Sequence, residues 1–562
     1  MLIKKLENIK FLPAVLLAVI ILLQSVNICR IFVNDKKSFY CDEVFSFGLA
    51  NSFYQPFIES DSVRSQELHY VDEWFSGEVY RNYITVQDSQ RFRYDSVWYN
   101  QSQDRHPPLF YAVLHTVCSF FPNTFSKWFG FIPNLIYFAV TQIFLYRLAK
   151  NLLKSKYYAL LLCSFFGFAP ATIQNTMFIR MYCMLVMWTV IFMYLHSRLA
   201  NFESGNFAKD FLPIMIVTAL GSLTQYLFLF VAFVTAVCFC LWYLLQKKFG
   251  IFLKYSLSML SGVVLFFAVY PVAFRHLFLE ASSPQRRFAE QFVIAVRYVF
   301  QNNLAMAEAD AVWLSVFIPQ ILLLLLVLSA PLLFLFRKDL KKLFPKIKRF
   351  FEKVRSFFKT RHSVFSSKNF PVVMSMLFSV AVILVIVPYT VSFMDFFAER
   401  YLYIISPFVI LLVLGALYKL LSKVPAEKIP ALILTVLLSY NVISRMYMPK
   451  AWKSENPVDM DSMFNQNNVV VILHDKSNYD VLSTAACDLF HAGNVFFANC
   501  CDIKDDLPKI NSLRSDKPTY ILILPEYESY ENSDYVENIL SQYDYIETYM
   551  FINYYFLIYR SK

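Results

Sequence analysis

Apolar runs about as long as a membrane is thick recur along most of this chain. A helix needs about 20 apolar residues to cross the hydrocarbon core of a bilayer. Only 17% of the 562 residues are charged and 57% are hydrophobic, which excludes a string of soluble domains. We therefore expect a mainly α, polytopic membrane helical bundle of about 11 transmembrane helices. The predicted spans are 11–32, 126–148, 156–173, 178–198, 210–223, 226–246, 252–274, 311–336, 370–392, 401–422 and 429–445.

Basic residues predict how these spans are oriented. Three lysines lie within the first ten residues, before a run that is longer than the roughly 7–15 apolar residues of a cleaved signal peptide. We expect this run to be an uncleaved first helix that starts in the cytoplasm. Lys and Arg are enriched in cytoplasmic loops, and the basic clusters at 147–156 and 337–361 then fall on that side. With an odd number of spans, the segment after residue 445 is extracytoplasmic.

The same distribution explains the net charge of +11. The basic residues lie in short segments between apolar runs, so we expect no nucleic-acid partner. In segment 337–369, apolar residues recur at helical spacing between lysines, which predicts an amphipathic helix on the anionic inner leaflet. The simplest interpretation of that segment is a membrane anchor without chemistry.

The polar chemistry gathers in the predicted outer loops, above all in the loop 33–125. Near its end, about 13 apolar residues follow Pro108, too few to span, so we expect a helix along the outer interface. No Asp, Glu, Lys or Arg falls at the centre of a predicted span. Ion-driven transporters usually carry ionisable groups there. This pattern favours chemistry at the membrane face.

Segment 446–562 has a different composition and predicts a small extracytoplasmic α/β domain. Strand-like runs at 469–473, 495–497 and 520–524 alternate with helical stretches, and two more strands are expected over 544–560. The segment has no GxGxxG turn and no phosphate loop, so nucleotide binding is unsupported. Whether Cys487 forms a disulfide with Cys500 or Cys501 stays open.

Two adjacent carboxylates, Asp42 and Glu43, stand just after the first apolar run. One interpretation is structural, because acidic residues favour the first turn of a helix. The other is functional, because a second polar cluster, Asp104-Arg105-His106, ends the same loop.

Several motifs together resemble a known family. They are Tyr40-Cys41-Asp42-Glu43-Val44-Phe45, Asp104-Arg105-His106-Pro107-Pro108-Leu109, Phe178-Ile179-Arg180-Met181-Tyr182, Thr224-Gln225-Tyr226 and Glu399-Arg400-Tyr401-Leu402. The set, within residues 1–445, is similar to the GT-C membrane glycosyltransferases, nearest to the protein O-mannosyltransferases and the bacterial aminoarabinose transferases. Thr-Gln-Tyr departs from the commoner Thr-His-Tyr. The resemblance implies a GT-C transmembrane catalytic domain over 1–445. It also implies transfer of a sugar, with inversion, from a polyprenyl-phosphate carrier to an acceptor hydroxyl outside the cytoplasm.

The resemblance also implies roles for individual residues. Asp42 matches the family's catalytic aspartate, and a carboxylate is a suitable general base for a hydroxyl nucleophile. Glu43 is a second candidate, or orients Asp42 or the loop. Asp104 is expected to orient His106 or to contact the acceptor. A departing lipid phosphate needs cations, and Arg binds phosphate with two hydrogen bonds. Candidate phosphate contacts are Arg105, His106, Arg180, Arg275, Arg286, Arg287 and Arg400. Each arginine also suits a simple contact with lipid headgroups.

The implied partners are the polyprenyl-phosphate-sugar donor, membrane lipids and an acceptor that is a cell-envelope lipid, a glycan or a protein. Carboxylates and phosphate can share a divalent metal, but the nearest groups transfer without one, so no cofactor is expected. The alternative function is a lipid-linked glycan flippase or transporter, which also needs many spans and basic grooves. A glycan polymerase or ligase is a third hypothesis, for which we would expect the dominant outer loop late in the chain.

Overall fold

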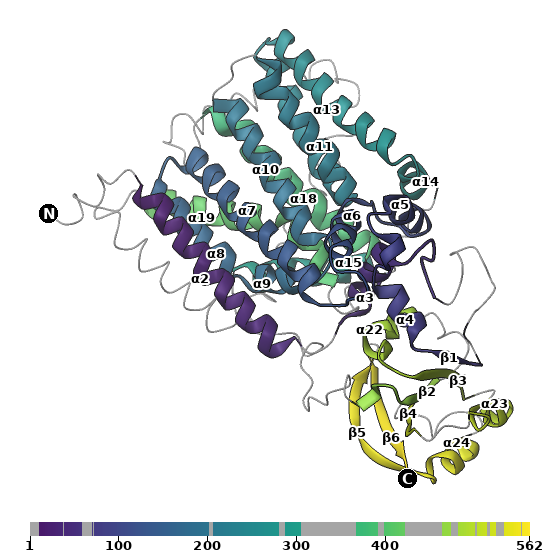
Figure 1. Ribbon diagram of the computed structural model, residues 1–562. Coiled ribbons are helices and arrows are strands. Elements are labelled where there is room, and N and C mark those ends of the chain that lie inside the picture. Colours follow the sequence, from purple (N-terminus) through teal and green to yellow (C-terminus); the bar gives the residue numbers. More distant parts are fainter. Residues whose placement is uncertain are drawn as a thin grey trace. The chain divides into compact units, whose positions relative to one another are not determined.

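A computed structural model describes most of the chain, and its contacts divide it into two compact units (Figure 1). The helical unit comprises Met1–Ile28, Asn134–Met177 and Met181–Tyr447, and the loop–sheet unit comprises Cys29–Pro133, Phe178–Arg180 and Met448–Lys562. The described residues are 11–36, 39–58, 70, 72–201, 206–279, 287–304, 367–391, 398–421, 463–473, 482–500, 503–513, 517–523, 533–551 and 554–562.

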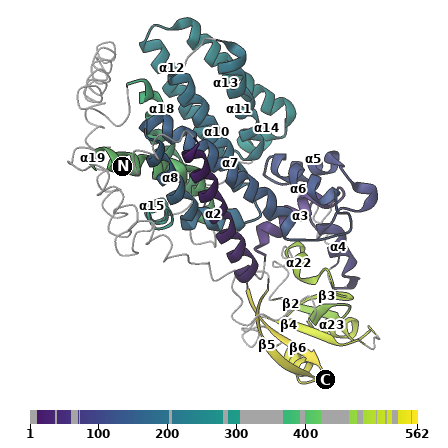
Figure 2. The same ribbon diagram turned by 60° about the vertical axis from the view of Figure 1, so that its left-hand side comes forward.

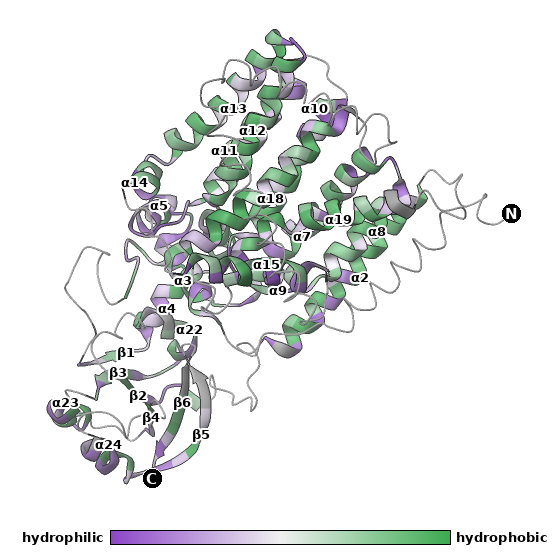
Figure 3. Ribbon diagram, turned by 180° about the vertical axis from the view of Figure 1, so that it is seen from behind, coloured by the Kyte–Doolittle hydropathy of each residue, from purple (hydrophilic) through white to green (hydrophobic). Residues whose placement is uncertain are grey.

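Long apolar helices dominate the described part of the chain, and Figure 3 shows hydrophobic residues along most of their length. By length and composition, eight are suited to cross a membrane among the described residues, and the pair α8 and α9, bent by 57°, makes a ninth if it is one span. The chain is therefore a multi-pass membrane protein. The helices are α2 (Leu12–Asp35), α7 (Trp128–Leu153), α8 (Lys156–Phe168), α9 (Pro170–Met177), α10 (Tyr182–Asn201), η2 (Phe207–Phe211) with α11 (Leu212–Thr224), α12 (Leu227–Leu245), α13 (Phe249–Val269), α18 (Phe370–Thr390) and η4 (Ala398–Ile405) with α19 (Ser406–Leu421). Two further helices of this unit are α14 (Ala273–Phe278) and α15 (Phe288–Leu304).

These helices match nine of the eleven predicted spans. The predicted spans at 311–336 and 429–445 lie outside the described residues, as does nearly all of the predicted amphipathic segment 337–369. The same holds for the predicted domain boundary near residue 446. The count of eleven thus stays a prediction, whereas a polytopic helical bundle is confirmed.

Buried amides hold the first helices of the helical unit together. Gln24 of α2 is fully buried, and its Nε2 donates to the carbonyl oxygens of Cys163 at 3.1 Å and Ser164 at 3.0 Å in α8. The Nε2 of Gln142 in α7 donates to Gln24 Oε1 at 2.7 Å. A side chain at Gly167 would overlap the Gln24 amide. Polar contacts between helices therefore add to apolar packing here, as is common in membranes.

The loop–sheet unit contains the short helices α3 (Cys41–Asn51), α4 (Glu78–Ile84), η1 (Asp88–Gln90), α5 (Tyr94–Gln103) and α6 (Leu109–Ser119). Helix α6 has 11 residues and is apolar but too short to span. The prediction of a short helix after the proline pair is therefore confirmed.

A six-stranded sheet forms the C-terminal part of this unit, in the order β1-β3-β2-β4-β6-β5 (Figure 2). Strand β2 (Asn468–Leu473) pairs in parallel with β3 (Asn494–Asn499) and β4 (Thr519–Ile523), and β5 (Tyr543–Phe551) and β6 (Tyr554–Ser561) are antiparallel. The predicted strands are confirmed. Helices α23 (Ile503–Ile510) and α24 (Ser533–Leu540) pack against the sheet core, and the short η7 (Ser483–Ala485) and α22 (Ala486–Leu489) precede β3.

One edge strand comes from far away in the sequence. Strand β1 (Trp74–Ser76), from the first loop, pairs antiparallel with β3, with Trp74 opposite Phe496. The Nε1 of Trp74 also donates to the carbonyl oxygen of Lys509 at 3.0 Å. Three residues are too few to show a strand pattern, so this pairing was not predicted. Cys487 and Cys500 do not form a disulfide with each other, and Cys501 lies outside the described residues.

Gly77, directly after β1, permits a close backbone approach. A Cβ at this position would overlap the carbonyl oxygen of Ala492. We expect Gly77→Ala to destabilise the junction between β1 and β3 by about 1–3 kcal/mol, because backbone has to move. Gly250→Ala is the matched control, since its Cβ would meet no atom within 4 Å. Limited proteolysis within the loop and the thermal unfolding midpoint report the difference, and equal behaviour of the two variants would contradict this account.

Candidate active site

The first turn of α3 carries both carboxylates that the sequence singles out. Tyr40 precedes the helix in an extended conformation, and its N–H donates to Glu43 Oε2 at 2.9 Å. Such a side-chain cap satisfies a backbone donor that the helix leaves unpaired. Acidic residues in a first turn also interact favourably with the helix dipole. The local sequence therefore explains why α3 begins at Cys41.

Glu43 is fully buried and its oxygens are occupied. The Nζ of Lys36 donates to both carboxylate oxygens at 2.8 Å, and the backbone N–H of Ile179 donates to Oε1 at 2.8 Å. Lys36 is 2% exposed, and burial lowers its pKa although Glu43 acts in the opposite direction. Lys127 donates from Nζ to the Lys36 carbonyl oxygen at 3.1 Å. The ion pair ties α3 to Lys36, and the hydrogen bond from Ile179 ties it to the segment 178–180.

Asp42 lies in a different environment from its neighbour. Its side chain is 19% exposed, and its Oδ1 lies 3.8 Å from Nη2 of Arg180, a residue that is 4% exposed. The Nη1 of Arg180 donates to the hydroxyl of Tyr111 at 2.9 Å and to Ser46 Oγ at 3.4 Å. The separation of 3.8 Å is longer than a hydrogen bond. The hydroxyls of Tyr111 and Ser46 thus hold the Arg180 guanidinium. This positive charge lies beside the Asp42 carboxylate, which remains accessible.

A second acid–base pair lies in the turn between α5 and α6. Asp104 Oδ2 and His106 Nδ1 are 2.7 Å apart, and both side chains are 19% exposed. Burial acts to raise the pKa of Asp104, but His106 and Arg180 outweigh it and bring this pKa down to about 2. Arg180 therefore acts electrostatically on both Asp42 and Asp104.

The lowered pKa of Asp104 predicts a dependence of stability on pH. A carboxyl group with a depressed folded-state pKa stabilises the fold above its unfolded pKa, and this contribution disappears as pH falls through the folded value. For Asp104 the loss should occur between about pH 4 and pH 2 and amount to roughly 2 kcal/mol. Thermal unfolding as a function of pH measures it. In the Asp104→Asn variant this part of the profile should flatten, and an unchanged profile would argue against the pairing.

The structure brings five of the predicted site residues together in the loop–sheet unit: Asp42, Glu43, Asp104, His106 and Arg180. Arg105 lies in the same turn and is exposed. The remaining described candidates belong to the helical unit.

In the helical unit the candidate arginines have separate surroundings. Arg400 donates from Nε to the Tyr182 hydroxyl at 3.3 Å, and its guanidinium lies 4.7 Å from the ring centre of Tyr401. Arg275 Nη2 is 3.5 Å from His276 Nε2 in α14. Arg287 has an 80% exposed side chain, 3.8 Å from Glu290. Arg286 lies outside the described residues.

Sequence reasoning missed Lys36 and assigned no role to Tyr111. A signal for Lys36 existed, because a lysine at the predicted outer end of a span departs from the positive-inside distribution. Tyr111 follows the Asp104–Leu109 motif by two residues, but no sequence pattern connects it with Arg180. In the part of the chain that the structure describes, no group of three or more His, Cys, Asp or Glu residues is arranged to hold a metal.

No protein-family model and no curated protein matches the sequence. Solved structures are similar to the structure of this chain. Over its length, the chain is similar to ArnT. The crystal structure of ArnT from Cupriavidus metallidurans in the apo state aligns with a TM-score of 0.48 and 10% identity over 97% of both chains. The structure of the same protein bound to undecaprenyl phosphate aligns with a TM-score of 0.45 and 10% identity over 98% of both chains.

Proposed function

We propose that this protein transfers a sugar from a polyprenyl-phosphate carrier to an acceptor hydroxyl on the extracytoplasmic face of the membrane, with inversion. One observation carries the proposal, namely the different surroundings of two adjacent carboxylates. Glu43 is buried and saturated with donors, whereas Asp42 is partly exposed beside the buried Arg180. A carboxylate that stabilises the fold is buried and hydrogen-bonded, as Glu43 is. A carboxylate that acts as a general base has to be accessible to the acceptor hydroxyl, as Asp42 is.

In the proposed reaction Asp42 accepts the proton of the acceptor hydroxyl as its oxygen attacks the anomeric carbon. The new carbon–oxygen bond forms while the bond to the carrier phosphate breaks, and the phosphate leaves with the electron pair. Attack opposite the leaving group inverts the anomeric centre. The nearby guanidinium of Arg180 favours the ionised form of Asp42. Glu43 acts as a positioning residue, because it anchors the helix turn that carries Asp42.

The departing phosphate requires positive charge or hydrogen-bond donors. Asp104 Oδ2 lies 2.7 Å from His106 Nδ1 and orients the imidazole ring. We propose His106 as the first phosphate contact. Arg105, Arg275, Arg286, Arg287 and Arg400 are further proposed contacts. The acceptor is proposed to be a cell-envelope lipid, a glycan or a protein, and the domain at 446–562 to lie on the same side of the membrane as the site.

Reconstitution of the full chain in proteoliposomes tests the function. The donors are a panel of polyprenyl-phosphate sugars in which the sugar is labelled. Lipid, glycan and protein acceptors are tested with each donor. We expect an acceptor-dependent glycosidic bond of inverted configuration, determined by NMR, and release of polyprenyl phosphate. Translocation of a lipid-linked glycan without a new glycosidic bond would overturn the proposal in favour of the flippase hypothesis.

A further inference from the structure

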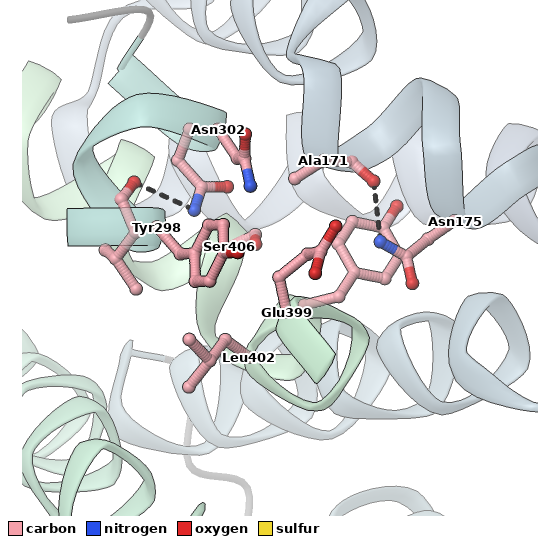
Figure 4. Close-up of a pocket in the computed structure, with 10 residues that line it drawn as sticks. Ala171, Asn175, Tyr298, Asn302, Glu399, Leu402 and Ser406 are labelled. Carbon is pink, nitrogen blue, oxygen red and sulfur yellow. Dashed lines mark hydrogen bonds between the residues drawn. The ribbon is translucent and has the colours of Figure 1, made fainter. Parts of the chain in front are cut away.

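A small cavity with several polar side chains in its lining lies among the helices of the helical unit (Figure 4). Asn175 of α9, Asn303 of α15, Glu399 of η4 and Ser406 at the start of α19 line it. Its free space suits about one water molecule. Three parts of the chain that are distant in sequence, α9, α15 and the continuous segment of η4 and α19, thus contribute polar side chains to one small space.

In both asparagines that line this cavity, the amide nitrogen donates a hydrogen bond within its own helix. Asn175 Nδ2 donates to the carbonyl oxygen of Ala171 at 2.8 Å, and Asn303 Nδ2 donates to that of Val299 at 3.1 Å. Asn175 and Asn303 are 4% and 2% exposed. Among the described residues, neither Oδ1 atom has a hydrogen-bond partner, nor has Ser406 Oγ. Buried acceptors without donors are costly, so an occupant with positive or donor character is indicated.

Glu399 adds a carboxyl group to these oxygens. It is partly buried, and within the described part of the chain it forms no ion pair. The next residue, Arg400, directs its guanidinium to Tyr182 and Tyr401. A carboxylate in a weakly polar interior needs a compensating charge or a proton.

We propose that this cavity binds one dehydrated monovalent cation of sodium's size, between the Glu399 carboxylate and the oxygens of Asn175, Asn303 and Ser406. A water molecule matches the volume but would not compensate the charge. Carboxylate, carboxamide and hydroxyl oxygens are ligands for hard cations, and a single carboxylate balances one positive charge. The break between α8 and α9 and the 3-10 turn η4 border the site. Such interrupted helices coordinate ions in other membrane proteins. The inference does not depend on the proposed transferase function.

Thermal unfolding of the purified full chain in detergent tests this site. At constant ionic strength and pH, sodium chloride is compared with potassium chloride and with N-methylglucamine chloride. Sodium at about ten times its dissociation constant should raise the unfolding temperature by about 1–2 °C, because it binds only the folded state. The increase should be lost in Glu399→Gln and reduced in Asn175→Ala and Asn303→Ala. Gln174→Ala, which changes the adjacent amide outside the cavity lining, should keep it.

Three outcomes would overturn the proposal. The first is equal stability of the parent in all three salts. The second is a sodium effect that survives unchanged in Asn175→Ala and Asn303→Ala, which keeps the test decisive if Glu399→Gln does not fold. The third is a stability that depends on pH in the parent but not in Glu399→Gln and that does not depend on sodium. This result would indicate a protonated Glu399 with a water molecule in the cavity.

Discussion

Replacing Asp42 by asparagine is expected to lower the rate of sugar transfer by about 10²–10⁴-fold, the usual contribution of a general base. Asparagine has the same shape but does not accept the proton of the attacking hydroxyl. The unfolding temperature should change little, because the contact of Asp42 with Arg180 is 3.8 Å long and Arg180 keeps its hydrogen bonds to Tyr111 and Ser46 and the nearby charge of Asp104. Single-turnover transfer in proteoliposomes, with saturating donor, measures the loss.

Asp95→Asn is the matched control for this experiment. Asp95 is an acidic residue of the same unit, its side chain is 50% exposed, and its partner is Arg93 at the surface. It should transfer sugar at the parental rate. Undiminished transfer by Asp42→Asn would rule out the proposed base, and loss of transfer in Glu43→Gln with a fully retained fold would point to Glu43 instead.

Breaking the buried pair of Lys36 and Glu43 is expected to be the most destabilising single change in the loop–sheet unit. The two side chains are 1% and 0% exposed. Removing one partner leaves the other charge buried, at a cost of about 3–5 kcal/mol. We therefore expect Lys36→Met and Glu43→Gln each to lower the unfolding temperature strongly and to expose the segment 178–180 to proteolysis.

A double-variant cycle separates this pairing from a general effect of mutation. Lys36→Met combined with Glu43→Gln should cost clearly less than the sum of the single variants, because no unpaired charge remains. Arg93→Ala, which breaks the exposed pair with Asp95, should leave stability almost unchanged. Strict additivity of the two single variants would show that the buried charges do not stabilise each other.

Properties of contiguous residues made the overall architecture predictable. The length of each apolar run determines whether it can span a bilayer, and the runs that became α12 and α18 needed no knowledge of their neighbours. The length of α6 and the strand-like runs of the C-terminal segment were predictable for the same reason. Strand β1 was not predictable, because its three residues are too few to show the alternation of apolar and polar residues that indicates a strand.

The candidate site was only partly predictable. The residues Asp42, Glu43, Asp104 and His106 stand in local motifs, so the sequence alone named them as candidates. It distinguished Asp42 as the base from Glu43 only through the family resemblance, because the environments of adjacent acids differ only in burial and partners, which the sequence does not contain. That distinction depends on Lys36 and Ile179, and Ile179 is 136 residues from Glu43.

The sequence by itself thus determined that this is a polytopic helical membrane protein with a C-terminal α/β segment, and which loops carry its polar chemistry. Hydropathy and alternation over neighbouring residues are sufficient for that. Only the tertiary structure decided that Arg180 stands beside Asp42, that Glu43 is a buried anchor, and that Asn175, Asn303 and Glu399 line one cavity. Contacts between distant segments depend on how the helices pack, and this packing produces no repeating pattern in the sequence from which the contacts could be predicted.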